Sequence, residues 1–254
     1  MDQRRFAPLP PEAAASLYEG LAGEEDWRLV LPYVPDAHRA GAISILALMR
    51  EVEGVPARVS EPMLGRIRCQ WWRDALDEAF GDGRARAHPL ACAIEEALSP
   101  RPELSAPLHA LVDGAEDALE AEDVTGEQDA LDAAARIWGN GAAALAVLLG
   151  QGDAASSAAR AASAHAVLRL AGRGDRRTGT RSLPRLSDRL SARPRPGDAS
   201  SLAALGRDAA RSVPPGGVAA VLPASLLAGY ARGAEPSPLG KRTRYFQAVL
   251  RGRA

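Results

Sequence analysis

Apolar residues recur at intervals of three and four along most of the chain, the spacing of an α-helix with one buried face. Helices are therefore predicted at residues 11–22, 36–53, 61–80, 88–98, 104–122, 125–150, 153–170, 201–211, 216–231 and 236–251. No stretch shows the sustained alternation of a β-strand, and no glycine-rich phosphate loop follows one. We expect one all-α domain spanning residues 1–254, in which helix packs on helix.

The segment VSEPMLGRIRCQWWRDALDEAF, residues 59–80, contains two of the four tryptophans in the chain. Two apolar lines about 100° apart follow the predicted helix: Leu64, Ile67 and Trp71, and Trp72, Leu76 and Phe80. So wide an apolar face predicts a central helix rather than a surface helix. The tryptophans either pack in the core or wall an apolar cavity, and the candidate cavity-lining residues are Ile67, Trp71 and Trp72.

Two pairs of carboxylates have the i, i+4 spacing that places both side chains on one helix face. They are Asp74 with Glu78, and Asp113 with Asp117. Such a pair can offer two oxygens to Mg²⁺, so these four residues are candidate metal ligands. The alternative is a hydrated acidic surface, stabilised in part by basic side chains one turn away. The sequence leaves both interpretations open.

Charge and cysteine content limit the classes of function. The 254-residue chain has a formal net charge of −1, which argues against general nucleic-acid binding. Cys69 and Cys92 form no CxxC motif, and unpaired thiols are typical of the reducing cytosol. The N-terminal segment has no apolar signal-peptide core, and the apolar runs are shorter than the roughly 18–20 residues of a membrane span. We expect a cytoplasmic protein, soluble or peripherally associated with a membrane, and no nucleic-acid partner.

The stretch SEPMLGRIRCQWWRDALDE resembles the squalene/phytoene synthase family of head-to-head prenyl synthases. It is most similar to the short branch that includes the complex I assembly factor related to phytoene synthase. Softer similarities in PDAHRAGAISILALMREVEGV, HPLACAI and RRTGTRSLPRL extend the resemblance over roughly residues 25–190. The resemblance implies an isoprenoid (prenyl) synthase-type helical bundle with a central cavity. In active members, two DxxxD motifs in that cavity hold Mg²⁺, which stabilises the diphosphate leaving groups.

This chain departs from the family at both motifs. The first is expected near residues 50–59, where Glu51 and Glu53 are two apart and face different sides of a helix. The second is expected near residues 165–177, where Asp175 stands alone and Ala171 occupies the position four residues before it. A single acid at each place is not enough for the metal cluster of the reaction. We therefore carry no catalytic aspartate over to this chain and expect no resident cofactor.

Two basic segments have alternative interpretations. Residues 172–200 form an irregular, arginine-rich connection, in which Arg176, Arg177 and Arg181 are candidate contacts to a diphosphate or an anionic lipid. The alternative is a solvated loop. The C-terminal GKRTRYFQAVLRGRA, residues 240–254, either lies on a membrane surface or forms a helix docked on the bundle.

Two functions follow from these features. The first is a catalytically degenerate family member that binds a lipid or isoprenoid, or that serves as a respiratory complex I assembly factor through protein contacts. The second is an active Mg²⁺-dependent prenyl diphosphate transferase of isoprenoid biosynthesis, with metal held by Asp74, Glu78, Asp113 and Asp117. The lost acid pairs favour the first function.

Overall fold

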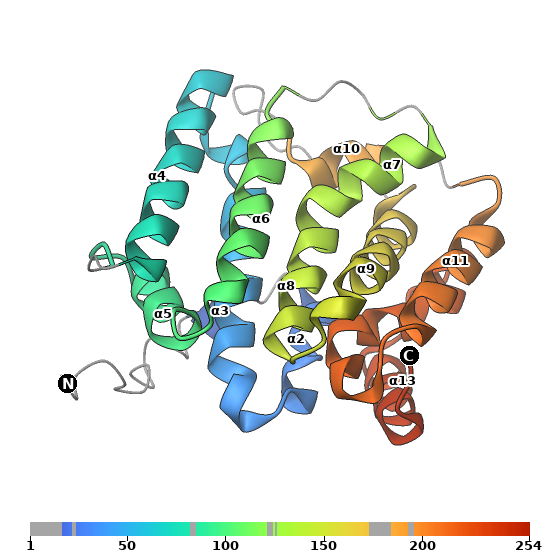
Figure 1. The fold of residues 1–254 in the computed structure, drawn as a ribbon. Helices are drawn as coiled ribbons and strands as arrows, with labels where there is room; N and C mark the ends of the chain where they lie inside the picture. Colours follow the sequence, from blue (N-terminus) through green and yellow to red (C-terminus); the bar gives the residue numbers. More distant parts are fainter. Residues whose placement is uncertain are drawn as a thin grey trace.

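The computed structural model describes residues 17–21, 24–81, 85–120, 124, 126–172, 184–192 and 196–254. Within these ranges every regular element is a helix, as the sequence predicts. The α-helices are α2 (Glu25–Arg28), α3 (Asp36–Glu53), α4 (Pro62–Phe80), α5 (Pro89–Leu98), α6 (Ser105–Asp117), α7 (Glu127–Ala134), α8 (Asn140–Leu148), α9 (Ala155–Leu170), α10 (Leu186–Ala192), α11 (Ala199–Arg211), α12 (Leu227–Ala231) and α13 (Pro238–Arg251). They pack into the all-α bundle of Figure 1.

Short 3₁₀ and π-helical segments lie between the α-helices. The 3₁₀ turns are η2 (Leu31–Tyr33), η3 (Pro56–Arg58), η4 (Pro102–Leu104), η6 (Gly152–Ala154) and η7 (Pro215–Leu226). The π-helical turn η5 (Ala135–Gly139) joins α7 to α8, so the long helix predicted at 125–150 is continuous but locally widened. The helix predicted at 216–231 is largely the 3₁₀ segment η7, which contains Pro223, and only Leu227–Ala231 is α-helical. A proline inside an α-helix removes a hydrogen bond and its ring clashes with the preceding turn.

Helix α9 lies in the middle of the bundle and contacts α7, α8, α10, α11, α12 and η7. Figure 1 shows it between α8 and α11. Its buried positions are mostly alanines, and these small side chains let neighbouring helices approach closely. At the α9–α11 contact, a Cβ added to Gly206 would lie 2.8 Å from the Cβ of Ala164. The alanine-rich composition thus explains how neighbouring helices can bury the C-terminal part of α9 on every side.

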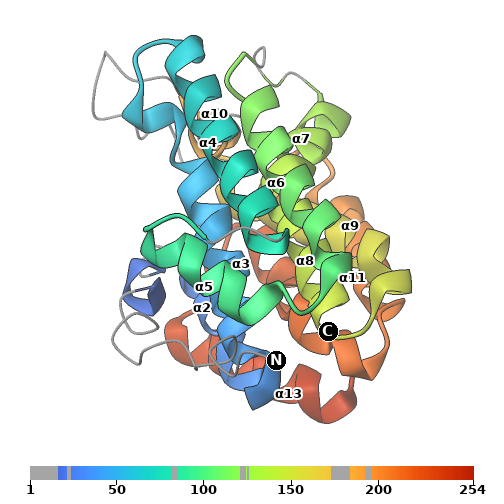
Figure 2. The ribbon, with the colours of Figure 1, turned by 60° about the vertical axis from the view of Figure 1, so that its left-hand side comes forward.

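Helix α4 lies at the edge of the bundle, so the prediction of a central helix at 61–80 is wrong. It packs against α5 and α6, on the side of the molecule opposite α11 (Figure 2). The buried stripe of α4 consists of Gly65, Cys69, Trp72, Ala75, Leu76 and Ala79. The other apolar line points outward, with Leu64 46% and Ile67 60% exposed. Small residues form much of the buried stripe, so hydrophobicity alone did not identify the packed face.

Helix α13 is docked on the bundle, as one of the two interpretations of the C-terminal segment expected. Ser237 caps it by accepting a hydrogen bond from the Gly240 amide, Pro238 occupies the first turn, and Gly252 ends it with a φ of 63°. The Tyr245 side chain is fully buried beneath it. These local signals explain why its predicted bounds agree with the structure.

Candidate functional site: a closed central cavity with acids at its edge

A small cavity lies between α2, α3 and the π turn η5. Its lining residues are Leu21, Glu24, Trp27, Leu46, Met49, Arg50, Glu53, Ile137 and Trp138. The cavity volume is about 20 Å³, which is room for about one water molecule. Pockets that bury a small-molecule ligand usually measure about 300–1,000 Å³. The cavity is therefore closed to a prenyl diphosphate in this conformation.

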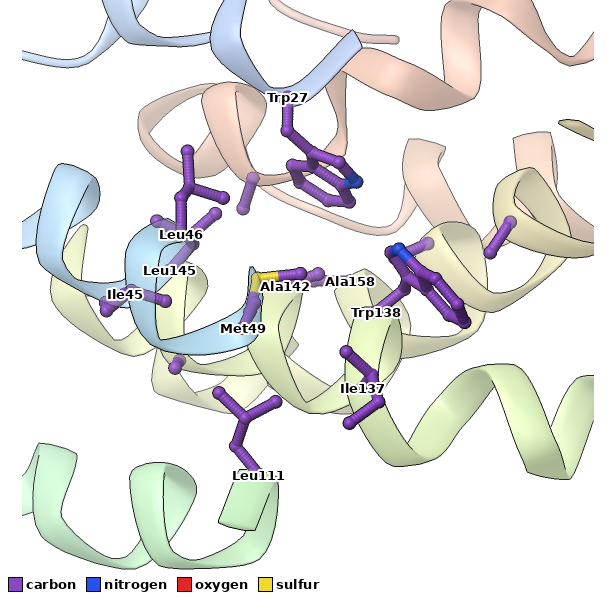
Figure 3. Packing of buried hydrophobic residues seen from close by; sticks show 14 of the residues in the cluster. Trp27, Ile45, Leu46, Met49, Leu111, Ile137, Trp138, Ala142, Leu145 and Ala158 are labelled. Atoms are coloured by element: carbon purple, nitrogen blue, oxygen red, sulfur yellow. The ribbon is translucent and has the colours of Figure 1, made fainter. Parts of the chain in front are cut away.

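Large side chains fill the space at the centre of the bundle. Trp27 and Trp138 are 1% and 3% exposed. Figure 3 shows the Trp138 ring close to Ile137 and the Trp27 ring nearer to Met49, and all four residues line the cavity. Met49 occupies the space above Gly141, where an added Cβ would lie 2.1 Å from its sulfur. Buried aromatic rings and a flexible methionine together fill irregular gaps efficiently. This packing is what reduces the cavity to its present size.

The two glutamates of the expected first motif diverge. Glu51 forms a bidentate ion pair with Arg58, in which Arg58 Nη2 lies 2.9 Å from Oε2 of the glutamate. Glu53 instead lines the cavity and accepts a hydrogen bond from the Ser187 hydroxyl at 2.5 Å. Burial raises the pKa of Glu53, and the nearby charge of Glu24 adds to the increase. The first motif region therefore supplies one carboxyl group to the cavity, in an environment that favours its protonated form.

Helix α9 presents basic rather than acidic side chains to the cavity side. His165 and Arg169 are one turn apart, within the segment where the second acidic motif was expected. Arg169 is 8% exposed, and its Nη2 donates a hydrogen bond to Glu24 at 3.0 Å. A guanidinium at this place neutralises the second carboxylate that lines the cavity. Asp175 lies outside the described residues.

A buried polar network lies beside the cavity and joins four helices. Its centre is Asp26, which is 1% exposed. The carboxylate accepts hydrogen bonds from Tyr230 Oη at 2.6 Å and His165 Nε2 at 3.0 Å, and it pairs with Lys241 Nζ at 2.8 Å. Tyr245 donates to the backbone carbonyl of Asp26 at 2.9 Å. The network therefore fastens α2 to α9, α12 and α13.

The protonation states in this network follow from burial and charge. Burial alone would raise the pKa of Asp26, but the hydrogen bond from His165 and the charges of Arg169 and Lys241 outweigh it and hold the pKa well below its usual value. Burial lowers the pKa of His165, although Asp26 opposes the change. A neutral His165 must then carry its proton on Nε2, because an ionised Asp26 can only accept. The network favours the Asp26 carboxylate as a charged acceptor.

Comparison with protein families identifies the fold. The family model of squalene/phytoene synthase matches residues 22–171, which include α2 to α9 and most of the residues around the cavity. The chain belongs to the squalene/phytoene synthase family. No curated protein and no solved structure gives a significant match.

Trp71 and Trp72 of this family member do not line the cavity, contrary to one of the two predictions. Trp71 and Trp72 pack edge to face with ring centroids 4.9 Å apart, and His88 lies 5.4 and 5.2 Å from them. Trp72 is buried at the α4–α5 contact, which agrees with the core-packing alternative. Ile67 cannot line a central cavity because α4 is peripheral and turns this side chain to solvent.

The four candidate metal ligands have basic partners or face solvent on the outer helices. Asp74 and Glu78 both pair with Arg86, at 3.1 and 2.9 Å. Asp113 pairs with Arg73 at 2.8 Å, and Asp117 is exposed. None of the four lines the central cavity. Arg176, Arg177 and Arg181, the candidate diphosphate contacts, lie outside the described residues.

The cavity residues do not fit the Mg²⁺–diphosphate site of active family members. Arg169 neutralises Glu24, and Glu53 is in an environment that favours protonation. Among the residues with described positions, no three His, Cys, Asp or Glu side chains gather as a metal site. Mg²⁺ prefers several ionised oxygen ligands, which this arrangement does not supply.

Sequence reasoning missed Glu24, Asp26, His165, Tyr230 and Lys241. The network contacts join residues more than 130 positions apart, so no local pattern reveals them. One signal was present. Lys241 falls on the same helical stripe as Tyr245 and Ala248, where a lone base among buried positions indicates a buried partner.

Proposed function

We propose that the protein is a non-catalytic member of the squalene/phytoene synthase family that acts by binding rather than by prenyl transfer. One observation carries the proposal: the cavity measures about 20 Å³ and receives only one carboxyl group from the first motif region, that of Glu53. Ionisation of a prenyl diphosphate needs positive charge held where the leaving group forms. Glu24 is paired with Arg169 and Glu53 accepts a hydrogen bond from Ser187, which supports the proposal that neither acid holds a divalent metal.

The binding function that we favour is contact with another protein. The resemblance of residues 60–78 to the assembly-factor branch suggests a respiratory complex I assembly role. That same segment exposes Met63, Leu64 and Ile67, which are 58%, 46% and 60% exposed on the outer face of α4. Neighbouring exposed apolar side chains are typical of a protein contact. A lipid or isoprenoid ligand in the cavity would first require Trp27 and Trp138 to move apart.

We also propose a cytoplasmic location, either free or at a membrane surface. The two cysteines of the chain are unpaired, as is typical of a reducing compartment. Burial raises the pKa of Cys69 to about 11, so this thiol stays protonated and unreactive. In the described part of the chain, no helix combines the length and hydrophobicity needed to cross a bilayer.

The alternative function is Mg²⁺-dependent prenyl transfer, and one observation favours it. Glu24 and Glu53 line the same cavity although they come from different helices, so two carboxyl groups are close to each other. If the cavity opened, these acids and not Asp74, Glu78, Asp113 or Asp117 would be placed to hold Mg²⁺. The metal would then stabilise the charge of a departing diphosphate.

Incubation with farnesyl or geranylgeranyl diphosphate and Mg²⁺ tests the proposal. We expect no Mg²⁺-dependent release of diphosphate above a protein-free blank. Steady turnover that is lost in Glu53→Gln, but kept in the outer-helix variant Asp113→Asn, would establish the alternative. Turnover lost in Asp113→Asn and kept in Glu53→Gln would instead place the metal on the outer helices and also overturn the proposal.

A further inference from the structure

A second and much larger concave site is lined by residues of α11, η7 and α13. Figure 1 shows α11 and α13 on the same side of the molecule, near the C-terminal end of the chain. This groove has a volume of about 920 Å³ and is open to solvent. Its floor includes Ser225 of η7. All of its lining residues follow residue 171, so the groove lies beyond the part of the chain that matches the family model.

Arginine dominates the lining of this groove. The arginines are Arg207, Arg211, Arg244, Arg251 and Arg253, and none of the lining residues, all of which are described, is acidic. Arg211 pairs with Asp208 at 2.7 Å, and Arg244 donates to the Ser225 carbonyl at 3.4 Å. In the described part of the chain, Arg207, Arg251 and Arg253 have no ion-pair partner. The groove therefore concentrates positive charge that the protein itself leaves largely uncompensated.

The arginines converge from two helices onto one concave face. Gly240, Arg244, Gln247 and Arg251 follow at intervals of four, three and four, so they form one stripe along α13. Arg207 and Arg211 are one turn apart on the facing α11. The Ser225 hydroxyl is buried at this site without a hydrogen-bond partner in the described structure. Guanidinium groups and a free hydroxyl are the donors that bind phosphate oxygens.

Helix-end electrostatics explain only part of this arrangement. Arg211 and Arg251 lie in the last turns of α11 and α13, where a positive charge complements the helix dipole. Arg207 and Arg244 lie one to two turns before those ends, where the dipole effect has faded. Like charges gathered in a concavity repel one another, and a bound anion relieves that repulsion.

A stripe of exposed apolar side chains runs beside the arginines. Leu239, Phe246 and Leu250 are 74%, 55% and 70% exposed, and their spacing of seven and four places them on one face of α13. An apolar stripe next to arginines is the pattern of a helix that lies in a membrane interface. We propose that the groove binds the phosphate groups of anionic phospholipids, with this stripe set into the lipid surface. The proposal does not depend on whether the central cavity is catalytic.

Vesicle binding by the full chain tests this proposal. We expect sedimentation with vesicles of phosphatidylcholine and phosphatidylglycerol, and none with phosphatidylcholine alone. The variant Arg207→Gln/Arg251→Gln should bind the anionic vesicles roughly 25-fold more weakly, since each arginine near an anionic surface contributes about fivefold. The matched control Arg68→Gln/Arg160→Gln removes the same charge from exposed positions on α4 and α9 and should bind like the original protein. Equal weakening in both variants would show attraction by general charge and overturn the proposal.

A second pair of measurements distinguishes the lipid from a free phosphate. Leu239→Ser/Leu250→Ser should weaken vesicle binding but leave any calorimetric binding of inorganic diphosphate unchanged. Diphosphate binding that is lost in Arg207→Gln/Arg251→Gln, without vesicle binding by the original protein, would assign the groove to soluble phosphates and overturn the lipid proposal. If the Arg207 variant does not fold, Arg251→Gln/Arg253→Gln changes only exposed side chains and allows the same comparison.

Discussion

At the scale of single residues, the acidic side chains near the cavity are held by other side chains of the protein. Asp26 accepts hydrogen bonds from Tyr230 and His165, Glu24 accepts one from Arg169, and Glu53 accepts one from Ser187. A buried carboxylate is stable only when other groups compensate it. Among the described residues, Glu24, Asp26 and Glu53 near the cavity therefore each have a partner within the chain.

Stability should depend on pH through His165. The pKa of this buried histidine is lowered from its ordinary value of 6.5, so below that pH the unfolded chain binds a proton that the folded chain does not. The free energy of unfolding should therefore fall as pH decreases through about 6.5, by up to about 1.4 kcal/mol per pH unit.

Chemical denaturation between pH 8 and pH 5 measures this dependence. His165→Gln should reduce the slope of the free energy of unfolding against pH by the contribution of one bound proton. His38→Gln, at a less buried histidine whose pKa is also lowered, should reduce this slope less. A curve for His165→Gln that parallels the original protein would show that the buried imidazole accepts its proton within the fold.

At the scale of the elements, close helix contacts depend on glycines and alanines. Helix α9 is lined with alanine, and α6 approaches the π turn η5 at Gly114. A Cβ on Gly114 would lie 2.4 Å from the carbonyl oxygen of Arg136, which is backbone and cannot move aside alone. Gly141 also lacks space, but its neighbour is the flexible side chain of Met49.

Alanine substitutions at these glycines should differ in effect. Gly114→Ala should lower the free energy of unfolding by about 1–3 kcal/mol, because α6 must shift away from η5. Gly141→Ala should cost less, because Met49 can change rotamer. Gly152→Ala, where an added Cβ meets nothing within 4 Å, is the matched control. Thermal denaturation of the three variants gives the order, and a larger loss for Gly141→Ala than for Gly114→Ala would contradict it.

At the scale of the whole molecule, the two ends of the described chain are joined. Lys241 of α13 pairs with Glu25 at 2.7 Å and with Asp26 at 2.8 Å, although more than 200 residues separate them. Lys241 is 2% exposed. This contact joins α13, with its arginine groove, to the part of the chain that matches the family model.

Removal of the Lys241 charge should therefore loosen α13. Lys241→Met leaves Asp26 with fewer partners in the core and should destabilise the protein by about 3–5 kcal/mol. Hydrogen exchange should quicken first in α13 and α2. The exposed pair Arg211–Asp208 provides the control, since Asp208→Ala should change stability by less than about 1 kcal/mol. An equal increase of the hydrogen-exchange rate in all helices of Lys241→Met would show that α13 does not loosen separately.

The sequence by itself determined the helical class, the bounds of α3 and α13, the family and the divergence of Glu51 from Glu53. Those features depend on helical period and on spacing within one helix, both of which are local. Only the tertiary structure decided that α4 is peripheral, that Trp27 and Trp138 close the cavity, and that Asp26 meets Lys241. The physical reason is that period shows which residues share a face, whereas burial depends on partners from distant parts of the chain.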